Sequence, residues 1–376
     1  MPASRLFAGV DQTFVSGLRG ALNGSGIDYE LVIAPSGTAS LKDQMTEKIQ
    51  RLLLEHAPDV VTGIMGAGLS RHMHVFFGDA ATPFMLNDMG ADPLMTGGAN
   101  NPYLFSNSFN LWQSMYALGD WAARHIGSKA CVAAAFHEAG YGIVQAFWLG
   151  FSGAGGRVLG TEVTHRASAD EDPSAQLRTL AALEPDFVMA FYSGREGIAF
   201  ANAWSGLGLA GTLPLVASPL MTHGYWGPKL GDAVVGMRTA ISWRLDSEEE
   251  EQTRFRKACN VSPGKEPAVF ALLGYETGLM LREAIASIDG APTRETLRDA
   301  LTGVAFASPR GSMRMDPVTR EVATVDYLHE IRRGPDGALA AVCREALPLP
   351  ASFQTHYDAI KSSEERAGWF NPYLVT

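Results

Sequence analysis

Cysteine is scarce in this sequence, and the few cysteines are not spaced as a metal or redox motif. Cys131, Cys259 and Cys343 lie far apart along 376 residues. An odd number of thiols leaves at least one free unless two chains crosslink. The cysteines therefore predict no metal site, and they do not decide the redox compartment.

Positive charge is also in short supply. The chain has 30 Lys and Arg against 40 Asp and Glu, which gives a formal net charge of -10 at pH 7. Binding nucleic acid requires clustered Lys and Arg that neutralise phosphates. Because no basic stripe is present, we expect no nucleic-acid partner. The one charge run, residues 248–251, is acidic and is typical of a helix N-terminus, where the helix dipole favours carboxylates.

Long apolar runs are absent as well. No stretch reaches the roughly 18 to 20 apolar residues of a membrane-spanning helix, and residues 1–20 lack the basic and apolar regions of a signal peptide. The chain is nevertheless 46% apolar, which is enough for ordinary hydrophobic cores. A length of 376 residues suits about two domains of roughly 150 residues each.

Catalytic motifs are missing too. The sequence has no Gly-x-Ser-x-Gly elbow and no His-Glu-x-x-His zinc motif. His72 and His74 are two apart on a predicted helix, hence roughly 200° apart around its axis, and are poorly placed to share a metal. The pair His137-Glu138 follows a predicted strand, where it would either serve acid–base chemistry or shape the wall of a binding site. We predict no catalytic residues, no metal and no cofactor.

What the sequence does contain is one pattern that occurs twice. In both copies an apolar-periodic helix ends before Pro-Asp, a short strand and a loop follow, and a second helix leads to a strand that begins with proline. The first copy is centred on residues 58–61 and the second on residues 185–188. Two halves built on one plan predict two similar α/β lobes.

The alternation of short β-rich runs with helical periods predicts parallel sheets joined by crossover helices. We expect strands at residues 29–33, 59–62, 83–86, 130–135, 157–163, 187–191, 214–217, 234–243 and 322–332. We expect helices at residues 11–22, 41–54, 69–77, 111–125, 144–152, 174–183, 197–207, 248–258, 268–288 and 293–301. Residues 100–108 are interpreted as a crossing between the lobes, and Gly334-Pro335-Asp336-Gly337 as a hairpin turn.

The loop at residues 63–71 is rich in glycine and lies between a strand and a helix. Gly66, Gly68 and Asp88 resemble a dinucleotide fingerprint, although Arg71 occupies the position of the third glycine. The same glycines also suit a small anion, because they let backbone amides at a helix N-terminus approach a carboxylate. A plain tight turn is the third reading of this loop.

Polar and aromatic residues gather where predicted strands end, which is where open α/β sheets bind ligands. In the first half these are Asn87 and Asp88, and in the second half residues 137–141, 192–195 and 218–223. Together they favour a ligand-binding role.

Three segments resemble the branched-chain amino acid type of periplasmic substrate-binding protein (type I). They are residues 186–194, the Ala-Gly-Tyr-Gly element at residues 139–142 and residues 271–276, within a resemblance that spans residues 7–333. The resemblance implies two Rossmann-like lobes with parallel central sheets, joined by three crossings, that close on a small ligand like a hinge. It further implies a non-enzymatic receptor in the periplasm that delivers its solute to the permease of an ABC transporter.

The resemblance also implies how the chain divides into lobes and which residues contact the ligand. It implies a first lobe of residues 1–108 and 239–306, a second lobe of residues 109–238 and 307–345, and a tail of residues 346–376 packed on the body. The expected ligand-binding residues are Phe7, Met65, Gly66, Ala67, Gly68, Asn87, Asp88, Met89, Tyr141, Tyr192, Arg195 and Ser218.

Two departures from the family pattern bear on the ligand. The serines usual at the positions of residues 66–68 are absent, and no carboxylate lies near Ser218, where an acidic residue often meets the ligand's ammonium group. Asp88 is expected to replace that acid, or else the ligand lacks an ammonium group. An amino acid, an amide and an aromatic or other organic acid all remain open.

A third departure lies at the start of the sequence. Family members begin with a strand at the centre of the first sheet, whereas residues 1–7 resemble the loop that follows it. We expect that strand, and any export signal, upstream of Met1. Two other functions remain open, namely a nicotinamide-dependent oxidoreductase that uses Gly66, Gly68 and Asp88, and a sensor domain that regulates a partner protein.

Overall fold

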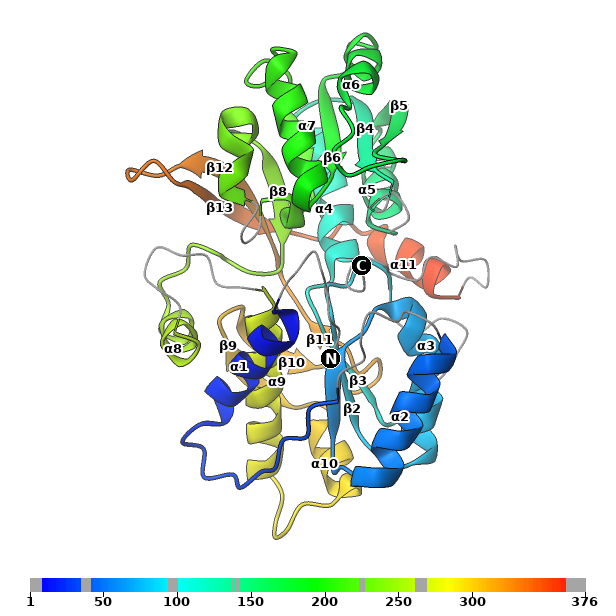
Figure 1. Cartoon of the computed structure of the whole chain (residues 1–376), viewed down its shortest axis with the longest axis vertical. Helices are drawn as coiled ribbons and strands as arrows, with labels where there is room; N and C mark the ends of the chain where they lie inside the picture. Colours follow the sequence, from blue (N-terminus) through cyan, green and yellow to red (C-terminus); the bar gives the residue numbers. More distant parts are fainter. Residues whose placement is uncertain are drawn as a thin grey trace. The chain divides into compact units, whose positions relative to one another are not determined.

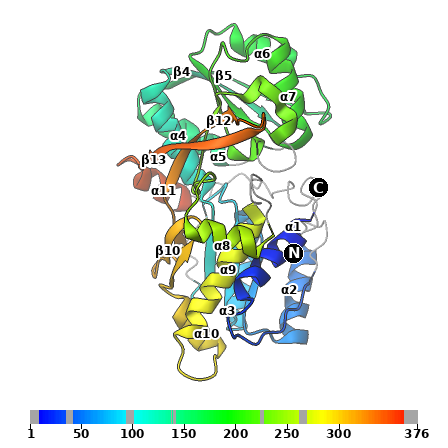
Figure 2. The same ribbon diagram turned by 90° about the vertical axis from the view of Figure 1, so that its left-hand side faces the viewer.

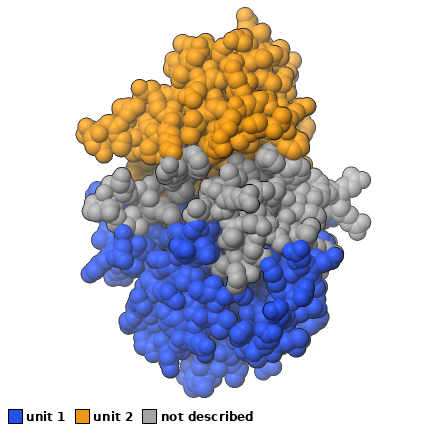
Figure 3. All heavy atoms as spheres, in the orientation of Figure 1, with its two compact units in different colours: residues 1–109, 247–324, 361–376 blue, residues 110–246, 325–360 orange. Residues whose placement is uncertain are grey.

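The computed structural model describes residues 9–34, 42–93, 101–136, 138, 142–222, 227–260 and 269–362. The chain divides into two compact units, which are coloured separately in Figure 3. Unit 1 comprises residues 1–109, 247–324 and 361–376, and unit 2 comprises residues 110–246 and 325–360. Phe7, Tyr141 and residues 363–376 of the expected tail lie outside the described residues.

Unit 1 is built around a parallel three-stranded sheet of order β1-β2-β3 (Figure 1). Its strands are β1 (Val61–Ile64), β2 (Phe84–Asp88) and β3 (Leu104–Ser108). Its helices are α1 (Val10–Leu22), α2 (Lys42–His56), α3 (Ala67–Asp79), α8 (Glu250–Ala258), α9 (Val269–Ala286) and α10 (Arg294–Leu301). A small antiparallel sheet completes the unit with β9 (Ala305–Ser308), β10 (Gly311–Met315) and β11 (Val322–Ala323).

Unit 2 contains a seven-stranded sheet of order β13-β12-β8-β7-β6-β4-β5. Its strands are β4 (Lys129–Ala135), β5 (Arg157–Thr164), β6 (Phe187–Phe191), β7 (Leu215–Ala217), β8 (Arg238–Ile241), β12 (Asp326–Arg333) and β13 (Leu339–Leu347). Its helices are α4 (Leu111–His125), α5 (Gly142–Gly153), α6 (Ser174–Ala181), α7 (Gly194–Gly206) and most of α11 (Phe353–Ser362), with two short 3-10 segments, η1 (Pro219–Met221) and η2 (Gly227–Val234). The neighbouring strands β5, β4, β6, β7 and β8 pair in parallel. Strand β12 runs antiparallel to both of its neighbours, β8 and β13.

These units confirm the predicted α/β class with parallel central sheets. The acidic run at residues 248–251 also lies where it was predicted, since Glu249 is the N-cap of α8 and Glu250 and Glu251 are in its first turn. The interpretation of residues 100–108 as a crossing was wrong, because Leu104–Ser108 is the buried strand β3. No helix within the described ranges has the length and hydropathy needed to span a membrane.

The division of the chain differs from the expected one. Residues 239–246 belong to unit 2 and residues 307–324 to unit 1, so both segments lie in the unit opposite to the one expected. The reason is local pairing: β8 joins β7 and β12 in the large sheet, and residues 305–323 pair among themselves as β9, β10 and β11. The chain passes between the units after residues 109, 246, 324 and 360.

Glycine allows two helix pairs to pack in backbone contact, one pair in each unit. A Cβ on Gly274 of α9 would lie 2.0 Å from the carbonyl oxygen of Phe14 in α1. A Cβ on Gly150 of α5 would lie 2.0 Å from the carbonyl oxygen of Tyr116 in α4. The two glycines that interrupt the long helical pattern at residues 268–288, Gly274 and Gly278, are therefore packing residues of α9.

We expect Gly150→Ala to lower the free energy of unfolding by about 1 to 3 kcal/mol, because even one methyl group must push α4 and α5 apart. Gly206→Ala in α7 is the matched control, since its added Cβ meets nothing within 4 Å among the described residues. The control should leave stability unchanged or raise it by up to about 1 kcal/mol. Urea unfolding followed by circular dichroism measures both, and equal effects would show that α4–α5 packing is not tight.

A groove of about 820 Å³ runs beside β1 in unit 1. It is lined by residues 26–34 on one side and 57–65 on the other, and apolar side chains such as Val15, Ile49 and Phe77 line it as well. The predicted strand at residues 29–33 is not formed, and β1 pairs only with β2 in the described part of the sheet. The groove therefore lies along the edge of β1, which is where a further strand of this sheet would pair.

Candidate functional site

In unit 1 the expected contacts lie at the carboxyl ends of β1 and β2. Met65 and Gly66 link β1 to α3, and Gly66 is the N-cap of that helix without any side-chain cap. Gly68 lies in the first turn of α3, and Met89 directly follows β2. The helix therefore presents its uncapped N-terminus beside the end of the sheet, which suits an anionic group of a ligand.

Asp88 is the expected residue whose chemistry is most unusual. It is the last residue of β2, is 7% exposed and pairs in register with Ser108 of β3. Within the described chain its Oδ1 has no hydrogen-bond partner. Burial raises the pKa of Asp88 to about 7, although hydrogen bonds from Ser108 and from the backbone of Gly90 oppose this rise. Asp88 thus holds an exchangeable proton near neutral pH.

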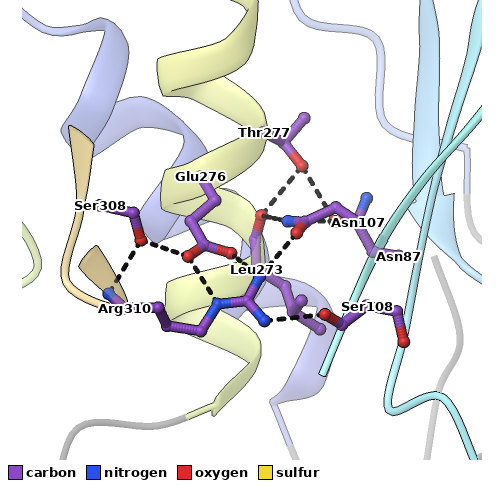
Figure 4. A network of polar contacts seen from close by, with 8 residues as sticks. All are labelled: Asn87, Asn107, Ser108, Leu273, Glu276, Thr277, Ser308 and Arg310. Atoms are coloured by element: carbon purple, nitrogen blue, oxygen red, sulfur yellow. Dashed lines mark hydrogen bonds and ion pairs between the residues drawn. The ribbon is translucent and has the colours of Figure 1, made fainter. Parts of the chain in front are cut away.

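Asn87, in contrast, has all of its amide atoms engaged inside unit 1 (Figure 4). Its Nδ2 donates to Thr62 Oγ1 (3.0 Å) and to Met85 O (3.1 Å). Its Oδ1 accepts from Thr277 Oγ1 (2.9 Å) and from Asn107 Nδ2 (3.3 Å). Because the side chain is fully buried, the structure places Asn87 as a support for β2 rather than as a direct contact.

The network around Asn87 continues to a buried ion pair between Arg310 and Glu276 of α9. Arg310 Nη2 lies 2.5 Å from Glu276 Oε2, and the two side chains are 1% and 0% exposed. Arg310 also donates to Asn107 Oδ1 (2.9 Å) and to the carbonyl oxygen of Ser108 (2.7 Å). The guanidinium therefore ties the end of β3 to α9.

In unit 2 the expected aromatic contact, Tyr192, lies in the hydrophobic core. It is fully buried, and its ring stacks on Phe200 with ring centroids 4.5 Å apart. Its hydroxyl lies 3.0 Å from Thr164 Oγ1. Burial raises the pKa of Tyr192 far above its ordinary value. Tyr192 consequently anchors the end of β6 to the end of β5.

The two other expected residues of unit 2 have different surroundings. Arg195 is exposed and forms an ion pair with Asp170. Ser218 is fully buried, and its hydroxyl accepts a hydrogen bond from the backbone N–H of Leu220 as the N-cap of η1. Ser218 therefore shapes the loop after β7, and Arg195 faces solvent.

The residue that sequence reasoning missed is Glu196, in the first turn of α7. It is 6% exposed, and its Oε2 has no hydrogen-bond partner in the part of the chain that the structure describes. Burial, followed by repulsion from the carboxylate of Glu138, raises the pKa of Glu196 to about 7. Glu138 follows β4 and is itself 1% exposed. Two buried carboxylates thus act on each other at the carboxyl ends of β4 and β6.

His165 directly follows β5 and is buried as well. Its backbone has φ of 56°, an uncommon value for a residue with a side chain. Its Nδ1 lies 2.7 Å from Thr164 Oγ1, and its ring centroid is 5.8 Å from that of Tyr192. Burial lowers the pKa of His165, so the imidazole is neutral at neutral pH. His165 therefore adds no positive charge at the end of β5 near neutral pH.

The sequence contained one signal for Glu196. Helical periodicity puts Glu196, Phe200 and Ala203 on one face of α7, and all three are buried. A carboxylate on the inner face of an apolar helix, one turn from a strand end, is a candidate ligand contact. Arg71 is a second missed residue, because its Nε is buried in α3 without a partner among the described residues.

Comparison with known proteins places this geometry in a family. The family model described as periplasmic binding protein matches residues 18–335. A curated relative, a Leu/Ile/Val-binding protein homolog of Brucella melitensis, is 24% identical over 63% of this chain. That alignment spans 61% of the relative's own length.

Solved structures share the fold over nearly the whole chain. An ABC transporter substrate-binding protein from Sphaerobacter thermophilus has a TM-score of 0.81 at 25% identity, over 90% of this chain and 94% of that one. A solute-binding protein of an ABC transporter from R. palustris, in complex with benzoate, has a TM-score of 0.75 at 24% identity, over 91% and 93%. This chain therefore belongs to the periplasmic binding protein family, as a type I member of the branched-chain amino acid receptor group.

Proposed function

We propose that this protein is the solute-binding receptor of an ABC-type uptake system, and that its solute carries a cationic group, as an amino acid does. The observation that carries the ligand class is the pair of buried carboxylates, Glu138 and Glu196. Two acids that repel each other in a buried place are stabilised by a cation that lies against both. A benzoate, the solute of one structural neighbour, supplies no such group.

Unit 1, taken by itself, offers groups that suit a carboxylate. The uncapped N-terminus of α3 and the buried Nε of Arg71 suit a carboxylate. The carboxyl group of Asp88, with its pKa raised to about 7, is a second polar contact that we propose for the ligand. We propose a periplasmic location and a membrane permease as partner, in line with the family, and no catalytic role for the chain.

A matched set of small molecules tests the ligand class by thermal shift and calorimetry. The set contains leucine, leucinamide, 4-methylpentanoate and benzoate, so that ammonium and carboxylate are removed one at a time. We expect leucine and leucinamide, or other amino acids in an extended panel, to stabilise the protein. A ligand at a hundredfold its dissociation constant adds about 2.7 kcal/mol.

Each other outcome rejects a different part of the proposal. Stabilisation by benzoate or 4-methylpentanoate but by no ammonium compound would keep the receptor role and overturn the cationic ligand. Stabilisation by NAD, with no response to organic solutes, would overturn the receptor role in favour of the oxidoreductase that Gly66, Gly68 and Asp88 resemble.

The raised pKa of Glu196 makes ligand binding depend on pH. Below a pH of about 7 the carboxyl group is largely protonated and cannot balance the charge of an ammonium group. We therefore expect the affinity for the cationic ligand to rise as pH increases through about 7, with proton release on binding that calorimetry in buffers of different ionisation enthalpy measures. The Glu196→Gln variant should lose most of this dependence. A profile unchanged in that variant would assign the proton to another group.

A further inference from the structure

Away from the candidate ligand site, three side chains of metal-binding type come together in unit 2. They are Asp246, which follows β8, His329 of β12 and Cys343 of β13. One donor atom from each lies within 4.8 Å of the other two. Asp246 is exposed, Cys343 is half-buried and His329 is fully buried, so the group is reached from solvent on one side only.

An irregularity in the sheet produces this arrangement. His329 pairs with Cys343, but the preceding residue, Leu328, pairs with Glu345, so Arg344 is an extra residue in β13. Such β-bulges redirect side chains and are common next to functional sites. At this bulge the backbone N–H of Cys343 donates to Asp246 Oδ2 at 3.0 Å. The bulge therefore holds the carboxylate beside the thiol and the imidazole (Figure 2 shows the β12–β13 hairpin).

The imidazole of His329 is held in the tautomer that a metal ligand requires. Its Nδ1 lies 3.2 Å from the carbonyl oxygen of Tyr327, which can only accept a hydrogen bond, so Nδ1 carries the proton. The lone pair is then on Nε2, which lies 3.4 Å from the backbone N–H of Leu245 and would turn to the metal on binding. A backbone carbonyl that orients the second ring nitrogen is a common support of metal-binding histidines.

We propose that Asp246, His329 and Cys343 form a binding site for Zn²⁺ or a similar borderline-soft divalent metal. Sulfur, nitrogen and oxygen donors together are typical of zinc, and three protein ligands leave the fourth position for water. Mg²⁺ and Ca²⁺ prefer oxygen ligands alone and are not expected to bind. As the metal–sulfur bond forms, the thiol of Cys343 releases its proton to solvent. Arg244, which contacts Cys343, offsets part of the negative charge.

The place of the site in the chain suggests its effect. Asp246 is the last residue of unit 2 before the chain enters unit 1, and β12 begins just after the chain returns at residue 325. A metal held by these residues would fix the segment that leaves β8 to the β12–β13 hairpin. The three ligands come from separate segments, which explains why no motif spacing was visible in the sequence.

Cobalt(II) tests the site because it reports the bound sulfur directly. Full-length protein without an affinity tag, freed of metal by chelator, is titrated with Co²⁺ and then with Zn²⁺. We expect a sulfur-to-cobalt charge-transfer band in the near ultraviolet. This band should disappear when Zn²⁺ displaces the cobalt ion. Cys343→Ala should abolish the band, and Asp246→Asn, at an exposed position, should weaken Zn²⁺ binding at least about tenfold, in line with losses seen when ligand-shell partners are removed.

The control is Cys259→Ala, which removes the other half-buried thiol and lies in unit 1. It should bind cobalt as the unchanged protein does. Absence of the charge-transfer band in the unchanged protein would overturn the proposal, as would a band that survives Cys343→Ala. A normal circular dichroism spectrum of Cys343→Ala ensures that its loss of binding is not a loss of fold.

Discussion

Arg310→Met should be among the most destabilising single substitutions in this protein, with a loss of about 3 to 5 kcal/mol in the free energy of unfolding. The substitution leaves Glu276 charged and fully buried without its cation. It also removes the donors that Arg310 gives to Asn107 Oδ1 and to the carbonyl of Ser108 (Figure 4). Urea unfolding that reports on unit 1 measures the loss.

The double variant Arg310→Met/Glu276→Leu separates the two causes. Replacing both members of a buried ion pair by apolar residues is often nearly neutral, since no buried charge remains. We expect the double variant to regain part of the lost stability, with the remainder due to the polar groups of Asn107, Ser108 and Ser308 that lose their partners. If the single and double variants were equally unstable, the buried charge would not be the cause.

This network explains how the strand ends of unit 1 are positioned. Arg310 holds the carboxyl end of β3 through Ser108, and Ser108 in turn hydrogen-bonds the side chain of Asp88 at the end of β2. Asn107 and Asn87 connect the same two strands to α9. The ends of β2 and β3 are thus fixed by the core of unit 1, which would keep the proposed contact Asp88 in place.

The helices and most parallel strands were predictable because their periodicity is strong. Residues 111–125 and 187–191, for example, have the same bounds in the prediction and in the structure. The strand β3 was missed because its sequence, Leu-Phe-Ser-Asn-Ser, follows two asparagines and a proline and is not a β-rich run. Its polar residues are buried only because distant partners such as Arg310 satisfy them, and a local pattern does not contain that information.

The candidate site was predicted in part for a similar reason. Position at strand ends drew attention to Asp88, which stays a predicted contact, but it gave equal weight to Asn87, Tyr192 and Ser218, whose polar atoms bond within their own unit. Glu196 was missed because its neighbour Arg195 was the more visible polar residue. The periodicity that puts Glu196 on the apolar face of α7 with Phe200 and Ala203 was the signal that separates these two adjacent side chains, and the structure shows Glu196 buried and Arg195 exposed.

Glu196→Gln should produce the largest loss of ligand affinity among substitutions in unit 2. Removing one charge from a buried ion pair costs about 2 to 5 kcal/mol of binding free energy, which corresponds to at least about a 30-fold rise in dissociation constant. The same variant should be at least as stable as the unchanged protein near neutral pH, because burial and Glu138 already disfavour the charge of Glu196 without ligand.

The expected effect of Glu196→Gln on stability follows from the raised pKa of Glu196 in the folded state. The folded state holds the Glu196 proton up to a pH of about 7, whereas the unfolded chain loses it near 4.5, so the stability contributed by this group falls as pH rises between these values. Glutamine keeps the size of the side chain and removes the titration.

Glu184→Gln, at an exposed position of the same unit, is the control and should change neither the ligand affinity nor the stability. Weaker binding together with equal or greater stability would identify Glu196 as a ligand contact. Weaker binding accompanied by lower stability would instead mean that Glu196 supports the fold, and the cationic ligand would then lose its main support.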